Sequence, residues 1–331
     1  MLILAGDIGG TKTRLQLSSH DNPLKPEYVH RQDYNSSDYA TFSDIIKEFL
    51  ESCKQPSKGL AHACFAIAGP IVDGTVQLTN LPWFIQEAQL HERFGIEKVK
   101  LINDFQAIGY GIDALEKKDF HALQNVKKDP HGFRAIIGAG TGLGIALSFW
   151  NGHYHEVNPT EGGHVDFAPT DDTQVELLHY LRNKLRRVSA ERVVSGIGIA
   201  NIYKFVRDNP LYNELENPVL KRRFLQEDPA ACVTEFAIKH RDPMATRALH
   251  HFIVSYGSIT GNLALTTLPY GGIYIVGGIA PKLLPQLSDG RFLQAYSNKG
   301  RMSPLLKNFP IEIVLNTDVG LMGAAVHATR L

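Results

Sequence analysis

The chain of 331 residues is 44% hydrophobic and 21% charged, an ordinary composition for a soluble globular protein that is long enough for two domains. Lysine plus arginine equals aspartate plus glutamate at 34 each, so the charge balance argues against a nucleic-acid or membrane-surface partner. Three scattered cysteines, and no apolar run near the ~20 residues of a membrane helix, predict no disulfide framework, no membrane span and a cytoplasmic location.

The first part of the chain predicts an α/β domain that opens with a hairpin. A strand over 2–6 reaches the turn Asp7-Ile8-Gly9-Gly10-Thr11, and the alternation over 14–18 indicates the return strand. Ser37-Asp38 is the expected cap of the first helix. Further expected elements are strands over 28–34, 61–68 and 98–102 and helices over 39–53 and 85–94.

A polar, basic stretch over 117–132 is a candidate seam between two domains. Beyond it, a strand over 134–137, a glycine-rich turn over 138–144 and a return strand over 145–150 repeat the opening plan, which indicates a duplicated core. The remainder predicts helices near 173–185, 189–206, 213–226, 229–240 and 243–267, strands over 272–276 and 311–315, and a last helix from Val319 that Asp318 caps.

The pair Asn103-Asp104 follows the apolar strand over 98–102 directly. Ligands of open α/β sheets bind at the carboxyl ends of the strands, so an Asp there is well placed to accept a proton and an Asn to orient a substrate. The alternative interpretation is that the pair only caps the next helix, as Asx residues commonly do.

Two glycine-rich turns are candidate phosphate sites. In Asp7-Ile8-Gly9-Gly10-Thr11, glycine N–H groups and the Thr hydroxyl could cradle an anion, and the Asp would be useful beside phosphate if Mg²⁺ lies between them. The alternative is a plain hairpin turn. The second turn, Gly138-Ala139-Gly140-Thr141-Gly142-Leu143-Gly144, fits neither GxGxxG nor a Walker loop, yet its four glycines in seven residues favour a second cradle.

The segment Glu161-Gly162-Gly163-His164-Val165-Asp166 combines carboxylates with an imidazole, a set that can grip neighbouring hydroxyl groups. A zinc site and a loop of purely structural polar contacts are the alternatives, and zinc is disfavoured because no second His or Cys stands at ligand spacing. Glu191, in Ser189-Ala190-Glu191-Arg192, opens a predicted helix and could simply favour its dipole.

These motifs, in this order and together with Gly277-Gly278-Ile279, resemble those of bacterial ATP-dependent glucokinases of the hexokinase/actin/Hsp70-type ATPase superfamily. The resemblance implies an α/β, two-domain hexokinase/actin-like (ribonuclease H-like) fold with related cores and an interdomain cleft for glucose and ATP. It also implies a homodimer. The small domain would comprise 1–114 plus 316–331 and the large domain 115–315.

The same resemblance implies phosphorylation of D-glucose at its 6-hydroxyl, giving glucose 6-phosphate and ADP and feeding glycolysis. Asp104 would be the catalytic base, and Asn103, Asp104, Glu161, His164 and Glu191 would bind the sugar. The cofactor would be ATP, with Mg²⁺ carried by the nucleotide and no metal site on the protein. The implied nucleotide contacts are Gly6, Asp7, Ile8, Gly9, Gly10, Thr11, Gly138, Gly140, Thr141 and Gly142 at the phosphates and Gly277 and Gly278 near the adenosine.

Two positions depart from the family pattern. Lys12 stands where many relatives carry a smaller polar residue, so an extra charge is expected near the first turn. Ile197, in Ser195-Gly196-Ile197-Gly198, stands where Pro is common. The alternative functions are a kinase for another hexose, such as mannose, glucosamine or fructose, and a sugar or nucleotide sensor without turnover.

Overall fold

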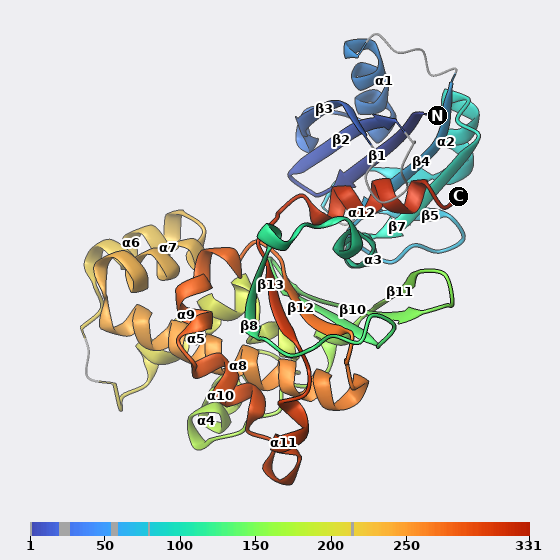
Figure 1. Cartoon of the computed structure of the whole chain (residues 1–331). Helices are drawn as coiled ribbons and strands as arrows, with labels where there is room; N and C mark the ends of the chain where they lie inside the picture. Colours follow the sequence, from blue (N-terminus) through green and yellow to red (C-terminus); the bar gives the residue numbers. More distant parts are fainter. Residues whose placement is uncertain (1, 20–26, 54–58, 79, 213–214) are drawn as a thin grey trace. The chain divides into compact units, whose positions relative to one another are not determined.

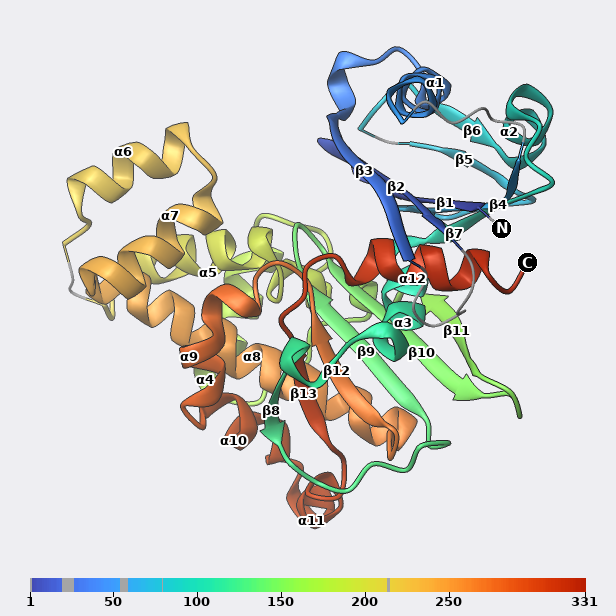
Figure 2. The same cartoon turned by 45° about the horizontal axis from the view of Figure 1, so that its top comes forward.

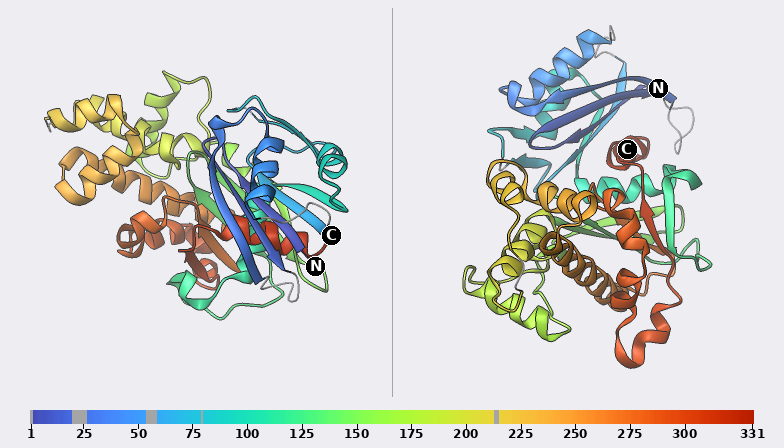
Figure 3. Two further views of the ribbon diagram at one scale, coloured as in Figure 1. Left: turned by 90° about the horizontal axis from the view of Figure 1, so that it is seen from above. Right: turned by 90° about the vertical axis from the view of Figure 1, so that its left-hand side faces the viewer.

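The computed structural model describes residues 2–19, 27–53, 59–78, 80–212 and 215–331 (Figure 1). The chain forms two compact units. Unit 1 comprises Met1–Asp119, His153–Pro159 and Asn316–Leu331, and unit 2 comprises Phe120–Gly152 and Thr160–Leu315. Both ends of the chain therefore belong to unit 1 (Figure 3).

Unit 1 is built on a five-stranded sheet in the order β3-β2-β1-β4-β7. Strands β1, β2 and β3 are antiparallel, as the predicted hairpin requires, and β4 and β7 continue the sheet in parallel. All the strands predicted for this part are present. Their bounds are β1 Leu2–Ile8, β2 Lys12–Ser19, β3 Glu27–Asn35, β4 Leu60–Ile67 and β7 Lys98–Asn103.

Helices cover both faces of this sheet, with α1 (Phe42–Ser52) on one side and α12 (Val319–Ala328) on the other (Figure 2). Successive side chains of β1 point to opposite faces of the sheet, and those of Leu4 and Ile8 join the core that contains α1. Helix α2 (Glu87–Phe94) joins that same core, whereas α3 (Asp104–Gly111) packs against α12. Short elements complete the unit: η1 Ser36–Asp38, β5 Thr75–Gln77, β6 Phe84–Gln86, η2 Ile112–Ala114 and η3 Lys117–Asp119.

Two local predictions in unit 1 are wrong. Ser37-Asp38 does not cap α1, because those residues form a 3₁₀ turn and Thr41 is the cap, its N–H donating to the Asp44 carboxylate at 3.0 Å. The helix predicted over 85–94 begins at Glu87, because residues 84–86 pair as a short strand with β5.

Unit 2 repeats the plan of a hairpin followed by parallel strands. Strand β9 (Arg134–Ala139) pairs antiparallel with β10 (Leu143–Trp150) and parallel with β12 (Gly272–Val276), which in turn pairs parallel with β13 (Ile311–Val314). The order β10-β9-β12-β13 matches β2-β1-β4-β7 of unit 1. The predicted duplication of the core is therefore confirmed.

Besides the short strands β5 and β6, two strands of the described residues were not predicted, β8 (Phe120–Gln124) inside the expected seam and β11 (His155–Thr160). β8 pairs antiparallel with β13 and closes the edge of the unit 2 sheet.

One face of the unit 2 sheet is covered by helices, and Ile137, Ile273 and Ile311 share a core with them. The long helix α8 (Pro243–Thr267) is fully as predicted and packs against α5 and α10 (Figures 1 and 3). The helical elements are η4 Gly162–His164, α4 Asp172–Arg182, η5 Ala190–Arg192, α5 Gly196–Asp208, α6 Pro218–Gln226, α7 Pro229–Glu235, η6 Phe236–His240, α8, η7 Pro281–Leu283, α9 Leu284–Ser288, α10 Arg291–Ser297, η8 Gly300–Met302 and α11 Ser303–Leu306.

Four predicted helices of unit 2 have different bounds, and the one near 173–185 is α4, which ends at Arg182. The one over 189–206 starts only at Gly196, and the one over 229–240 ends in the π-helical turn η6. In the segment 213–226, residues 213 and 214 lie outside the described residues, and α6 begins at Pro218 after its cap Asn217. No helix among the described residues is long and apolar enough to cross a membrane.

Candidate active site

Asp104 stands where β7 ends and α3 begins. Asn103 caps this helix, with its Oδ1 accepting from the Phe105 N–H at 2.9 Å and the Gln106 N–H at 3.3 Å. Asp104 is the first helical residue, and its Oδ1 also accepts from the Phe105 N–H at 2.9 Å. The capping interpretation is therefore confirmed for Asn103, whose amide NH₂ group takes no part in the cap.

Glycines bring the backbone of α3 into direct contact with its neighbours in unit 1. A Cβ on Gly111 would lie 2.1 Å from the carbonyl oxygen of Val319, and a Cβ on Gly323 would lie 1.7 Å from that of Ala107. Gly109 packs in the same way against the Val157 side chain. Such close contact leaves α3 little freedom, so Asp104 projects from a fixed element.

The first glycine turn connects β1 to β2. The Gly9 N–H donates to the Lys12 carbonyl at 2.9 Å, and Ser36 Oγ donates to the Gly9 carbonyl at 2.9 Å. Gly6 and Ile8, predicted as phosphate contacts, lie within β1, where a Cβ on Gly6 would meet the Phe65 ring at 2.7 Å. Ile8 is 1% exposed. These two residues therefore pack in the core beneath the turn.

Asp7 faces Arg14, its antiparallel partner, with Arg14 Nη1 at 4.0 Å from Asp7 Oδ2. Burial raises the pKa of Asp7, and the Arg14 guanidinium opposes that rise. Arg14 also contacts Asp318 Oδ1 at 3.2 Å. Lys12, the residue that departs from the family pattern, points to Asp33 with 2.5 Å between Nζ and Oδ2. The extra charge near the turn is thus paired.

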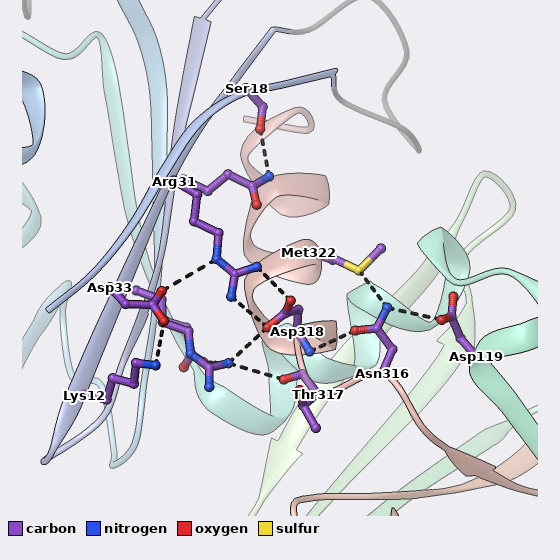
Figure 4. A network of polar contacts seen from close by, with 12 residues as sticks. Lys12, Ser18, Arg31, Asp33, Asp119, Asn316, Thr317, Asp318 and Met322 are labelled. Carbon is purple, nitrogen blue, oxygen red and sulfur yellow. Dashed lines mark hydrogen bonds and ion pairs between the residues drawn. The ribbon is translucent and has the colours of Figure 1, made fainter. Parts of the chain in front are cut away.

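Asp318 is the centre of this polar network (Figure 4). It occupies the cap position of α12, as predicted, but its side chain makes no cap hydrogen bond. Instead Arg31 donates to both carboxylate oxygens at 2.7 and 2.9 Å, and this contact holds the pKa of Asp318 below its usual value. Asn316 extends the network, accepting from the Asp318 N–H at 2.9 Å and donating to Asp119 Oδ1 at 3.3 Å.

The second glycine turn, between β9 and β10, is held by residues from two later segments. The Leu143 N–H donates to Glu191 Oε2 at 3.0 Å, and the Gly196 N–H donates to the Gly140 carbonyl at 2.8 Å. A Cβ on Gly142 would lie 2.4 Å from Glu191 Oε2. Glu191 lies in the first turn of the 3₁₀ helix η5, and the continuous helix predicted over 189–206 is wrong because α5 begins only at Gly196. The Glu191 carboxylate binds the glycine turn.

Glu161 caps the short turn η4 and His164 ends it, and both side chains are exposed, with 3.7 Å between Glu161 Oε2 and His164 Nε2. A Cβ on Gly163 would lie 1.9 Å from the Leu143 carbonyl oxygen, so this loop rests on the start of β10. Asp166 pairs with Arg187 at 2.8 Å, a structural contact. Within unit 2, the loop, Glu191 and the second glycine turn therefore come together.

A pocket of about 970 Å³ opens beside the second glycine turn in unit 2. Gly140, Thr141 and Gly278 line it, so two motifs far apart in sequence meet there. Gly277 adopts φ +89°, and a Cβ on it would lie 2.7 Å from the Ala139 carbonyl oxygen. This conformation and this close approach require glycine.

Sequence reasoning missed most of the residues that line this pocket. Ile197, 42% exposed, lies in it, which gives the departure from the family's Pro a position at the pocket surface. In the sequence, the segment Ser195-Gly196-Ile197-Gly198, which caps and begins α5, was the one motif that pointed to this side of the pocket. Further lining residues are Asn201, Lys204, Asp228, Thr234, Lys239 and Lys282.

The candidates fall into two sets. Unit 1 holds Asp7–Thr11 and Asn103-Asp104, and unit 2 holds Glu161, His164, Glu191 and both sets of glycines at the pocket. Among the described residues, no group of three or more His, Cys, Asp or Glu side chains is arranged to hold a metal ion.

Comparison with known proteins gives a consistent result. A family model described as Glucokinase matches residues 4–331. The glucokinase of Nostoc punctiforme is 46% identical over 341 residues, covering 100% of this chain and 99% of its own. The crystal structure of a glucokinase from an Antarctic psychrotroph, 30% identical, aligns with a TM-score of 0.85 over 100% of this chain and 99% of that one.

A more distant structure shares the fold. A ROK family glucokinase from Streptomyces griseus, solved in complex with glucose and AMPPNP, is 18% identical and aligns with a TM-score of 0.65 over 100% of both chains. The predicted two-domain α/β, actin-like fold class is confirmed.

Proposed function

The chain belongs to the glucokinase family, and on that premise we propose that it transfers the γ-phosphoryl group of ATP to the 6-hydroxyl of D-glucose. The products would be glucose 6-phosphate and ADP. The observation that carries the proposal is the position of Asp104, a carboxylate at the carboxyl end of a parallel strand, on a helix that glycine contacts hold in place.

Asp104 is the proposed general base. It accepts the proton of the 6-hydroxyl as the sugar oxygen attacks the γ-phosphorus of ATP in line. Phosphoryl transfer asks a protein mainly for positioning and charge stabilisation, so a fixed carboxylate suits the reaction. General-base assistance of this kind typically contributes about 10²–10⁴ in rate.

Asn103, Glu161, His164 and Glu191 are the proposed ligands of the sugar hydroxyls. The Asn103 amide NH₂ can donate to a hydroxyl while its oxygen caps α3. Glu161 and His164 present a carboxylate and an imidazole side by side in an exposed loop. Since Glu191 binds the Leu143 N–H, it would tie sugar binding to the shape of the second glycine turn.

MgATP is the proposed second substrate. The pocket lined by Gly140, Thr141 and Gly278 is large enough for the adenosine, because ligand pockets typically measure about 300–1,000 Å³. Gly9, Gly10 and Thr11 would face phosphate oxygens, and Asp7 is suited to bind the nucleotide's Mg²⁺, directly or through water. Gly6 and Ile8 would support that turn from the core.

The decisive experiment is Asp104→Asn with kcat and KM measured separately. We expect kcat to fall by about 10²–10⁴-fold while the KM for glucose changes much less. Asp172→Asn is the matched control, because Asp172 is likewise the first residue of a helix, α4, after an Asx cap. Near-normal turnover by the Asp104 variant would refute the assignment.

A panel of sugars with ATP, read by ADP release, separates the alternatives. The highest kcat/KM for glucose supports the proposal, whereas a preference for mannose, glucosamine or fructose assigns another hexose. Binding of glucose without any ADP release would instead indicate a sensor. The family resemblance also leads us to propose a cytoplasmic location and a homodimer. Sedimentation equilibrium of the purified chain would test the homodimer.

A further inference from the structure

A second cavity in unit 2, of about 850 Å³, is surrounded by cationic side chains and has no part in the proposed reaction. Its walls come from the first turns of α8, the residue Arg241 just before that helix, the turn η6, the first turn of α4, Tyr212 and the start of α10. Arg241, Arg247 and Arg291 line it together with His250 and His251, and no carboxylate occurs among the described residues that line it.

Two of the guanidinium groups are held in fixed positions. Arg247 lies over the ring of Tyr212, with 4.4 Å between its guanidinium carbon and the ring centroid. Arg291 is ion-paired with Asp289, to whose Oδ2 it donates from Nε at 2.9 Å and also from Nη2, and its Nη1 contacts His250 Nδ1 at 3.1 Å. A planar guanidinium that is already oriented loses little further freedom when it binds an oxyanion.

A third arginine, Arg241, reaches the same cavity from an unfavourable backbone conformation. The chain leaves the π-helical turn η6 through Arg241 in the left-handed region, with φ +52° and ψ +35°. Such a conformation is unfavourable for a non-glycine residue and tends to occur at functional sites. The N-terminus of α8 adds little, since Asp242 caps it and Pro243 has no N–H.

The two histidines that line the cavity are uncharged, and a bound anion would favour their protonation. Burial and the Arg291 charge hold the pKa of His250 below its usual value, and burial with the His250 charge lowers the pKa of His251 to about 4. Arg247 acts in the same direction, whereas Asp171 opposes it at both rings and Asp289 at His250. Both imidazoles are therefore neutral at pH 7, and a bound anion would raise both pKa values.

We propose that this cavity binds a small phosphate-bearing molecule, its phosphate held by Arg247 and Arg291 with Arg241 at the edge. A guanidinium group can donate two parallel hydrogen bonds to two oxygens of one phosphate. Two arginines therefore favour a phosphate group over a single carboxylate as the ligand. The volume exceeds what inorganic phosphate needs, and the hydroxyls of Thr173 and Thr246 offer hydrogen bonds to an organic part such as a sugar. The site is separate from the residues assigned to glucose and ATP.

The test is calorimetric titration of the full chain with inorganic phosphate and, separately, with glucose 6-phosphate. Saturating MgAMPPNP and glucose are present throughout to occupy the proposed active site. We expect one binding event in the wild type and at least tenfold weaker binding in the double variant Arg247→Gln, Arg291→Gln. Equal affinity for both probes means that the site recognises the phosphate group alone, and tighter binding of glucose 6-phosphate means that the sugar is recognised too.

Arg222→Gln with Arg301→Gln is the matched control, because it removes the same charge from exposed positions that do not line the cavity. A circular-dichroism melt of each variant checks that it is folded. In the NMR spectrum, phosphate should raise the pKa of His250 in the wild type and the control only. Failure of both probes to bind the wild type, or an equal loss of affinity in the control variant, would overturn the proposal.

Discussion

The contact between α3 and α12 yields a quantitative prediction because two glycines of α12 have very different surroundings. A Cβ on Gly323 would lie 1.7 Å from the Ala107 carbonyl oxygen and 2.6 Å from the Gly111 nitrogen. A Cβ on Gly320 would have Ile108 Cγ1 as its nearest neighbour, at an ordinary 3.6 Å. We therefore compare Gly323→Ala with Gly320→Ala as its control in the same helix.

The two substitutions should change stability in opposite directions. At Gly320 the gain in helix propensity stabilises the folded state by ~0.5–1 kcal/mol. At Gly323 the same gain is outweighed, since the obstructing atoms belong to the backbone and α12 must withdraw until the contact exceeds the 3.0 Å below which Cβ atoms are essentially never found. Overpacking typically costs about 1–3 kcal/mol, and a backbone obstruction belongs at the upper end of that range.

Urea unfolding measures this difference in unit 1 alone. The chain has two tryptophans, and Trp83, 2% exposed, lies in the unit 1 core, so a Trp150→Phe background isolates its fluorescence. Gly323→Ala should also lower kcat, by up to about 10²-fold for a displacement near 1 Å, since Ala107 lies one turn after Asp104. Equal urea midpoints for the two variants, or wild-type kcat in Gly323→Ala, would refute the reasoning.

Two further predictions concern the substrates. Glu161→Gln and His164→Ala should each raise the KM for glucose while kcat changes little, because both side chains are proposed to hold ground-state hydroxyls; an unchanged KM would remove them from the site. Arg14→Gln should move the acid limb of the pH–kcat/KM profile to higher pH, because burial already raises the pKa of Asp7 and the loss of the nearby cation raises it further. The ionised carboxylate would then be lost sooner as the pH falls, and an acid limb that does not move would contradict a working role for Asp7.

Sequence reasoning found the repeated core because its signal is local. An apolar run before Asp7 and another before Gly138 each end in a glycine turn with an alternating segment after it, and both form the expected hairpins. Strand β8 gave no such signal. Its five residues are half-buried or exposed, and its pairing with β13 joins segments nearly two hundred residues apart.

The errors at the site also arise from distant partners. Asp318 stands at the cap position of α12, as predicted, yet its carboxylate binds Arg31 and Arg14 on neighbouring strands and not the N–H groups of the helix. Glu191 stands before an apolar run, but its carboxylate accepts a hydrogen bond from the Leu143 N–H, and α5 begins only at Gly196. A short-range pattern describes what a side chain can bind, and the fold decides which partner reaches it.

Asn103-Asp104 shows how one pair can serve both structure and chemistry. A helix cap needs an acceptor on a residue outside the helix, and Asn103, with φ −64° and ψ 149°, meets that need. Asp104 then becomes the first helical residue, at the positive end of α3, where negative charge is favoured. With this pair alone the first turn of α3 would still fray. The glycine contacts with α12, a helix more than two hundred residues later, hold α3 in place. The local motif therefore predicts the carboxylate's position, whereas its rigidity depends on the chain's last helix.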